Sequence, residues 1–187
     1  MIGAHPGDCE LKAGGSAALW VKWGHEVRFV SATDGRLGHH SDWGANLAAR
    51  RWDEADAAGS ALGVEYHVLE IPDGHLEANL LNRREFVYMI RAFEPDLVLT
   101  HRPSDSHPDR RMTAQLVQDA VCMVTVPGFA PEMPHLPQKA VLGHALSLSP
   151  TALLYGLALH PGGRSHRARF RSDLHISRTS PANLCRP

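Results

Sequence analysis

The feature that most constrains the fold of this chain is a regular alternation of short β-forming runs with longer helix-forming segments. Residues 26–31 alternate polar residues with β-branched or aromatic ones, as a half-buried strand does. Residues 46–62 are rich in alanine and are followed by Gly63, a common helix terminator. The same reasoning predicts strands at residues 1–4, 26–31, 64–71, 96–100 and 140–142, and helices at residues 8–24, 46–62, 81–93 and 108–124.

Strands separated by helices predict an α/β fold, in which right-handed crossovers connect the strands of a parallel sheet. Ligands of such open sheets bind at the carboxyl ends of the strands. Three polar loops follow predicted strands, at residues 5–8, 33–38 and 101–107. We therefore expect these loops to share one rim of the sheet and to carry the functional residues.

The first of these loops lies within the sequence AHPGDCE at residues 4–10. His5 and Asp8 are both good ligands for Zn²⁺ and similar divalent metals, and their spacing can aim them at one ion. A His-Pro turn with Asp8 as a helix N-cap explains the same residues without a metal. Cys9 is either a reactive thiol at a helix start or a small buried side chain, and the second interpretation is the simpler one.

The loop after the fourth strand repeats this design in the sequence HRPSDSHPDRR at residues 101–111. Two loops of this kind on one rim indicate a site more strongly than either loop alone. The alternative is that Asp105 and Asp109 pair with the neighbouring arginines and cap the following helix. Arg51 and Glu54 lie one helical turn apart, so Arg51 either pairs with Glu54 or faces a substrate.

The composition excludes several classes of protein. The 19 basic and 20 acidic residues leave a formal charge of −1, so no global field favours nucleic acid or an acidic membrane. No apolar run reaches the ~20 residues that span a bilayer, and no secretory signal is recognisable. The three cysteines are odd in number and far apart, which argues against a disulfide framework. We expect a cytoplasmic protein.

The alternation is lost beyond about residue 145. Residues 160–187 contain six arginines and one acidic residue, with many Ser, Pro and Gly residues. We expect one domain at residues 1–145 and a divergent, basic, poorly ordered tail at residues 146–187, such as a frameshift would produce. Contact of this tail with nucleic acid is the functional alternative.

Five motifs, in this order, resemble those of the PIG-L/LmbE-like deacetylases: AHPGDCELKAGG, TDGRLG, RWDEADAAGSALGV, IPDG and HRPSDSHPDRR. The resemblance covers about residues 2–142 and implies a Rossmann-like α/β fold. It also implies zinc-dependent removal of acetyl from N-acetylglucosaminyl-type compounds, so the expected small-molecule partner is an N-acetylated amino sugar derivative. The residues that it implies are His5 and Asp8 as metal ligands, His107 and Asp109 as catalytic groups, and Arg51 and Asp73 as substrate contacts.

Two positions depart from the family pattern, because Gly7 stands where the family has its general base and Arg110 stands where it has its third metal ligand. A guanidinium has no lone pair for a metal and adds a permanent positive charge. A general base is worth ~10²–10⁴-fold in rate. We therefore expect weakly bound zinc and a weakened or absent deacetylase activity, with a non-catalytic sugar-binding relic as the alternative. Relative to the family, the chain also looks truncated at both ends.

Overall fold

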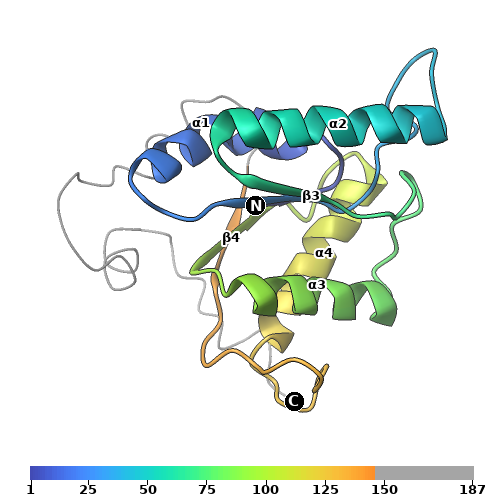
Figure 1. Ribbon diagram of the computed structural model, residues 1–187. Helices are drawn as coiled ribbons and strands as arrows, with labels where there is room; N and C mark the ends of the chain where they lie inside the picture. Colours follow the sequence, from blue (N-terminus) through green and yellow to red (C-terminus); the bar gives the residue numbers. More distant parts are fainter. Residues whose placement is uncertain (146–187) are drawn as a thin grey trace.

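The computed structural model describes residues 1–145 and shows the predicted alternation of strands and helices (Figure 1). All nine predicted elements are present in these residues, and the helices agree with their predicted bounds to within two residues. The predicted tail at residues 146–187 lies outside the described residues. The strands are β1 (Ile2–Gly3), β2 (Arg28–Ser31), β3 (Glu65–Val68), β4 (Leu97–Thr100) and β5 (Val141–His144), and the helices are α1 (Asp8–Lys22), α2 (Ala45–Leu62), α3 (Leu80–Phe93) and α4 (Pro108–Met123).

Every strand pairing in the described residues is parallel, as predicted, but the pairings are divided between two sheets. One sheet has the order β1-β2-β3, and the other consists of β4 and β5. The division occurs at β1, which is only two residues long. The contact between β1 and β4 includes a side-chain hydrogen bond in which Thr100 Oγ1 donates to the carbonyl of Ile2 at 3.0 Å.

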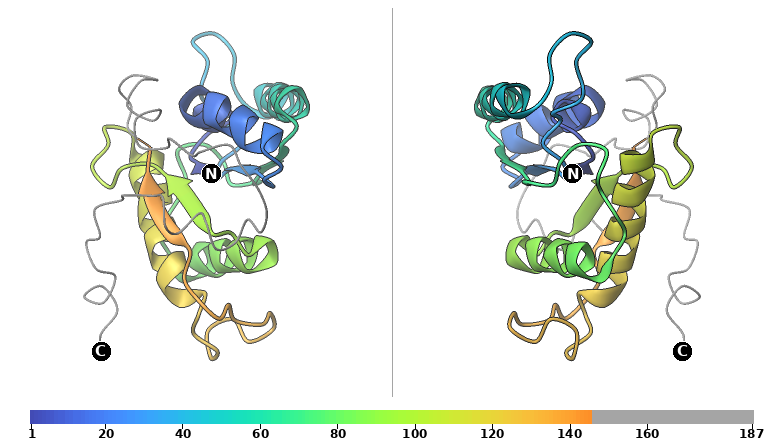
Figure 2. Two further views of the ribbon diagram at one scale, coloured as in Figure 1. Left: turned by 90° about the vertical axis from the view of Figure 1, so that its left-hand side faces the viewer. Right: turned by 90° about the vertical axis from the view of Figure 1, so that its right-hand side faces the viewer.

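The helices form two pairs, with α1 beside α2 and α3 beside α4 (Figures 1 and 2). Two apolar clusters lie beneath them, and strand β2 contributes to both. Phe29 packs with Cys9 and Ala13 of α1, whereas Val30 belongs to the larger cluster that includes Phe86 of α3. Neighbouring side chains of a strand point to opposite faces, which explains this division. None of the helices within residues 1–145 is long and apolar enough to cross a bilayer.

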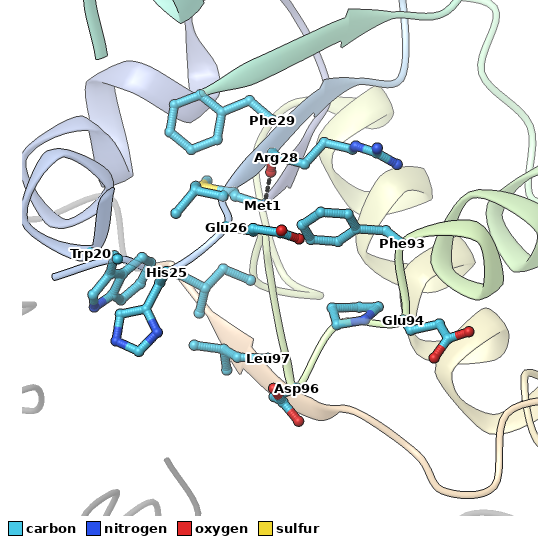
Figure 3. A pocket seen from close by; sticks show the side chains of 14 residues that line it. Met1, Trp20, His25, Glu26, Arg28, Phe29, Phe93, Glu94, Asp96 and Leu97 are labelled. Atoms are coloured by element: carbon cyan, nitrogen blue, oxygen red, sulfur yellow. Dashed lines mark hydrogen bonds between the residues drawn. The ribbon is translucent and has the colours of Figure 1, made fainter. Parts of the chain in front are cut away.

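A cavity of about 380 Å³ lies at the amino ends of β2 and β4 (Figure 3). Its wall includes Met1, whose amino group donates to the carbonyl of Arg28 at 2.7 Å, together with Phe93 and Leu97. Because the polar loops follow the carboxyl ends of the strands, this cavity is separate from the candidate site.

Candidate active site at the carboxyl ends of the strands

The loops that follow the strands meet at one rim, as predicted. The backbone N–H of Ala4, which follows β1, donates to His101 Nε2 beyond β4 at 2.9 Å. The backbone N–H of Asp73, which follows β3, donates to Asp34 Oδ1 beyond β2 at 3.2 Å. The ends of four strands therefore position the candidate residues. The IPDG turn that contains Asp73 lies at the same rim.

His5 lies at the centre of this rim and faces three carboxylates. Its Nδ1 is 3.3 Å from Asp8 Oδ2, and its Nε2 is 3.0 Å from Asp73 Oδ1 and 3.3 Å from Asp109 Oδ2. Burial alone would lower the pKa of His5, but the hydrogen bonds to Asp73 and Asp8 outweigh it and raise the pKa to about 9. His5 is therefore an imidazolium at neutral pH.

Asp8 is buried at the start of α1 and is surrounded by basic groups. Arg110 Nη2 donates to Asp8 Oδ1 at 2.8 Å, and Lys12 Nζ is 3.8 Å from the same oxygen. His101 Nε2 is 3.3 Å from Asp8 Oδ2. Burial would raise the pKa of Asp8, but hydrogen bonds to His101 and His5 and the nearby Arg110 charge hold it well below its usual range. Asp8 is therefore a paired carboxylate.

The N-terminal caps of the two helices that begin at the rim differ from those predicted. The prediction that Asp8 caps α1 is wrong, because Gly7 is the cap residue and Asp8 instead accepts from the His5 N–H at 3.1 Å. The cap of α4 is His107, whose Nδ1 accepts from the Asp109 N–H at 3.3 Å. The predicted pairing with arginines holds for Asp105, which is 3.3 Å from Arg102 Nε. Within residues 1–145, no arginine forms an ion pair with Asp109.

His107 and Asp109 lie next to His5. The His107 and His5 rings meet edge to face with centroids 4.5 Å apart. The Asp109 carboxylate is buried and also accepts from the Gly74 N–H at 2.7 Å, which fixes its orientation. His107 and Asp109, which follow the fourth strand, therefore lie together with His5.

Gly7, by contrast, brings no functional group to the rim. Its backbone has φ 104°, and the only atom near an added Cβ would be Leu11 Cδ1 at 4.0 Å. A side chain there would have room but would strain the backbone, since L-residues seldom adopt a positive φ. Aspartate tolerates this region better than most residues do.

Arg51 and Asp73 approach each other across Gly38. Arg51 Nη2 donates to the Gly38 carbonyl at 3.3 Å, and Arg51 Nη1 donates to Glu54 at 2.9 Å, so the simple ion-pair interpretation of Arg51 is confirmed. A Cβ on Gly38 would lie 3.7 Å from Arg51 Nη2 and 4.0 Å from Asp73 Oδ2. The two predicted substrate contacts thus border one patch beside His5.

Sequence reasoning gave no role to two further residues of the site, His101 and Lys12. His101 is fully buried, and Lys12 Nζ lies 2.9 Å from its Nδ1. The position of His101 directly after a predicted strand was a usable signal, whereas nothing local distinguished Lys12. Cys9 is buried, and burial raises the pKa of its thiol to about 12, so it is the unreactive side chain of the simpler interpretation.

Comparison with known proteins places this chain and its α/β fold in a known class. The family description of the GlcNAc-PI de-N-acetylases, PIG-L, matches residues 1–121. The chain belongs to this family.

Three known proteins are similar to this chain in sequence or structure. Diacetylchitobiose deacetylase of Thermococcus kodakarensis is 33% identical over 134 residues, which cover 68% of this chain and 50% of that protein. The structure of N,N'-diacetylchitobiose deacetylase from Pyrococcus horikoshii is 30% identical with a TM-score of 0.68, covering 74% of this chain and 56% of that one. 4-Oxalmesaconate hydratase of Pseudomonas putida is 26% identical over 139 residues, or 70% of this chain and 54% of that protein. The chain thus spans about half the length of the curated relatives it matches.

The residues present do not fit zinc at the position that the family pattern implies. On the family pattern Arg110 would occupy the third ligand position, and its guanidinium donates to Asp8 Oδ1, an oxygen that would otherwise be free to bind the ion. The other oxygen of Asp8 faces His5 and His101. A catalytic zinc normally has three protein ligands, but here an ion would have two ligands and a fixed positive charge beside it.

Proposed function

We propose that this chain is a PIG-L domain in which zinc-dependent hydrolysis of N-acetyl groups on N-acetylglucosaminyl-type compounds is strongly weakened or lost. The relatives named as deacetylases of acetylated amino sugars support the reaction and substrate class. The observation that carries the proposal is the 2.8 Å hydrogen bond from Arg110 to Asp8, because it places a cation where the family pattern has a metal ligand.

The two departures from the family pattern together replace the charge that a metal would bring. In the family pattern, two aspartates at positions 7 and 8 balance the two positive charges of Zn²⁺. Gly7 in place of an aspartate and Arg110 in place of a histidine each make the cluster more positive by one charge, so the two changes together equal the charge of the ion. Arg110 gives the buried Asp8 carboxylate a cationic partner without a metal, since a buried charge needs a partner. This pairing supports the joint loss of the family's metal site and general base.

A second candidate function, sugar binding without hydrolysis, is favoured by the patch that Arg51 and Asp73 border. The Asp73 carboxylate accepts from the Leu37 N–H at 3.3 Å, which holds it beside Gly38 and Arg51. Calorimetric titration with N-acetylglucosamine and with N,N'-diacetylchitobiose tests this function. We expect wild type to bind one of these sugars and Arg51→Ala to bind it at least about tenfold more weakly. Titrations of wild type in which neither sugar gives a binding signal would contradict sugar binding.

The proposed loss of hydrolysis is tested by restoring the two family residues. Wild type, Gly7→Asp, Arg110→His and the double variant are assayed for acetate release from N,N'-diacetylchitobiose with added Zn²⁺. Arg110→His returns a nitrogen donor and removes a repelling charge, so it should improve metal binding. Gly7→Asp alone should do little, because a base has no activated water to serve. The double variant should exceed Arg110→His by about 10²-fold or more, because a general base is restored.

Arg111→His is the matched control, since Arg111 lies beside Arg110 but donates to the backbone carbonyls of Asp105 and Ser106. It should leave acetate release at the wild-type level. Wild type that already matches the double variant would overturn the proposal. A folded double variant that binds zinc fully yet stays inert would show that Gly7 and Arg110 do not account for the loss.

A further inference from the structure

Two buried carboxylates of the rim have no lysine or arginine partner within the described part of the chain. Asp73 is 5% exposed and Asp109 is 1% exposed. The cations Arg110 and Lys12 both face Asp8 instead. A buried carboxylate is costly unless a cation or several donors compensate it. In the metal-free protein the His5 imidazolium faces both carboxylates, so a metal ion that displaces its proton would supply the compensating positive charge in its place.

Both of these carboxylates converge on one nitrogen, His5 Nε2, at 3.0 Å from Asp73 Oδ1 and 3.3 Å from Asp109 Oδ2. Ligand atoms around a tetrahedral zinc ion lie about 3.3 Å apart, because each is about 2.0–2.2 Å from the metal. The observed separations match that spacing. His107 completes the group, because one ligand atom from each of His5, His107 and Asp109 lies within 4.8 Å of the others.

We propose that this chain binds a divalent transition metal at a displaced site formed by His5, His107 and Asp109. Two imidazoles and one carboxylate suit Zn²⁺, Co²⁺ and Fe²⁺. Asp73 Oδ1 is a fourth possible ligand atom, because it contacts the same His5 nitrogen. Asp8 is not a ligand of this site, because Arg110 holds one of its oxygens and the two histidines face the other.

Neighbouring backbone groups support this arrangement. The Gly74 N–H holds Asp109 Oδ2 at 2.7 Å, so the ligand carboxylate is oriented before a metal arrives. Such outer hydrogen bonds fix ligand geometry in known metal sites. His107 starts α4, and Asp109 is the second residue of that helix, so one helix start delivers two of the three ligands.

The test is calorimetric titration of the full chain with Zn²⁺, repeated with Co²⁺ so that the visible spectrum reports the ligand field. His107→Asn removes one ligand but keeps a good helix cap, since Asn is among the preferred N-cap residues. Asp109→Asn removes a second ligand. His67→Asn is the matched control, because His67 is an exposed histidine on β3.

We expect one metal per wild-type chain and a loss of more than about tenfold in affinity for His107→Asn and Asp109→Asn, with the Co²⁺ spectrum lost as well. His67→Asn should bind as wild type does. Absence of binding by wild type overturns the proposal, and so does undiminished binding by His107→Asn or by Asp109→Asn. None of these results depends on acetate release, so this proposal and the proposed function fail separately.

Discussion

At the scale of single residues, the unusual group is His5, an imidazole held among three carboxylates. Its pKa of about 9 in the metal-free protein exceeds the ordinary value of 6.5 in an unfolded chain. A group whose pKa is raised by folding stabilises the protein fully below the unfolded pKa. That contribution is lost as the pH rises through the folded pKa.

We therefore predict that the unfolding free energy of the metal-free protein falls between about pH 6.5 and about pH 9. The His5 contribution to this fall is up to about 3 kcal/mol, which corresponds to the shift from 6.5 to about 9. Urea unfolding in the presence of a chelator measures it across this range. His5→Gln, which cannot be protonated, should lack this part of the slope. A His5→Gln profile parallel to that of wild type would contradict the prediction.

The sequence was informative about the residues of the site and less so about their partners. The family resemblance implied His5, Asp8, His107 and Asp109, and their position in polar loops after strands predicted that they meet at one rim. The pairing of Arg110 with Asp8 joins residues 102 positions apart, and no local pattern specifies it. For the same reason His107 was not recognised as a helix cap, since Ser, Thr, Asp and Asn are the usual signals.

At the scale of elements, one buried arginine of helix α3 binds the end of α4 and the segment that follows it through hydrogen bonds. Arg91 is 3% exposed and has no carboxylate partner within residues 1–145. Its guanidinium donates instead to the backbone carbonyls of Met123, Val124, Val126, Ala130 and Met133 at 2.7–3.3 Å. Two of these carbonyls lie at the carboxyl end of α4, where a positive charge is favourable.

Replacing Arg91 by Leu should lower the unfolding free energy by at least about 3 kcal/mol. The loss arises because buried carbonyls that lose their donor each cost about 1–3 kcal/mol. Chemical unfolding monitored by circular dichroism measures it. Arg83→Leu is the matched change on the same helix, since it removes a half-exposed ion pair with Asp119, and it should cost no more than about 1 kcal/mol. Equal losses of unfolding free energy in the two variants would show that the Arg91 hydrogen bonds do not stabilise this segment.

The elements themselves were largely predictable, and the exceptions have physical causes. Helices follow from apolar spacing and terminators, as with Phe86 and Ile90 on the buried side of α3 and Gly63 at the end of α2. The third strand was predicted too long, because the chain beyond Val68 turns towards Asp73. Arg91 has no sequence signal, since the carbonyls that it binds lie more than 30 residues away.

At the scale of the whole molecule, the site lies across the junction between the two sheets. His5 follows β1 of the three-stranded sheet, whereas His107 and Asp109 begin the helix that follows β4. Besides the site, this junction is spanned by the Thr100–Ile2 and Ala4–His101 hydrogen bonds. A metal held by His5, His107 and Asp109 would be a further link between the two parts.

Metal binding should therefore raise the stability of the folded chain. A ligand that binds only the folded state adds about 2.7 kcal/mol at a free concentration 100 times its dissociation constant. For a chain of 187 residues, a gain of 1 kcal/mol raises the melting temperature by about 2–4 °C. We predict that Zn²⁺ at that concentration raises the melting temperature of wild type by about 5–10 °C and that a chelator reverses the rise. His107→Asn should show at most about half of this rise, because a tenfold weaker affinity leaves about 1.4 kcal/mol of stabilisation at the same Zn²⁺ concentration. A Zn²⁺-dependent rise in this variant equal to that of wild type would place the stabilising ion elsewhere.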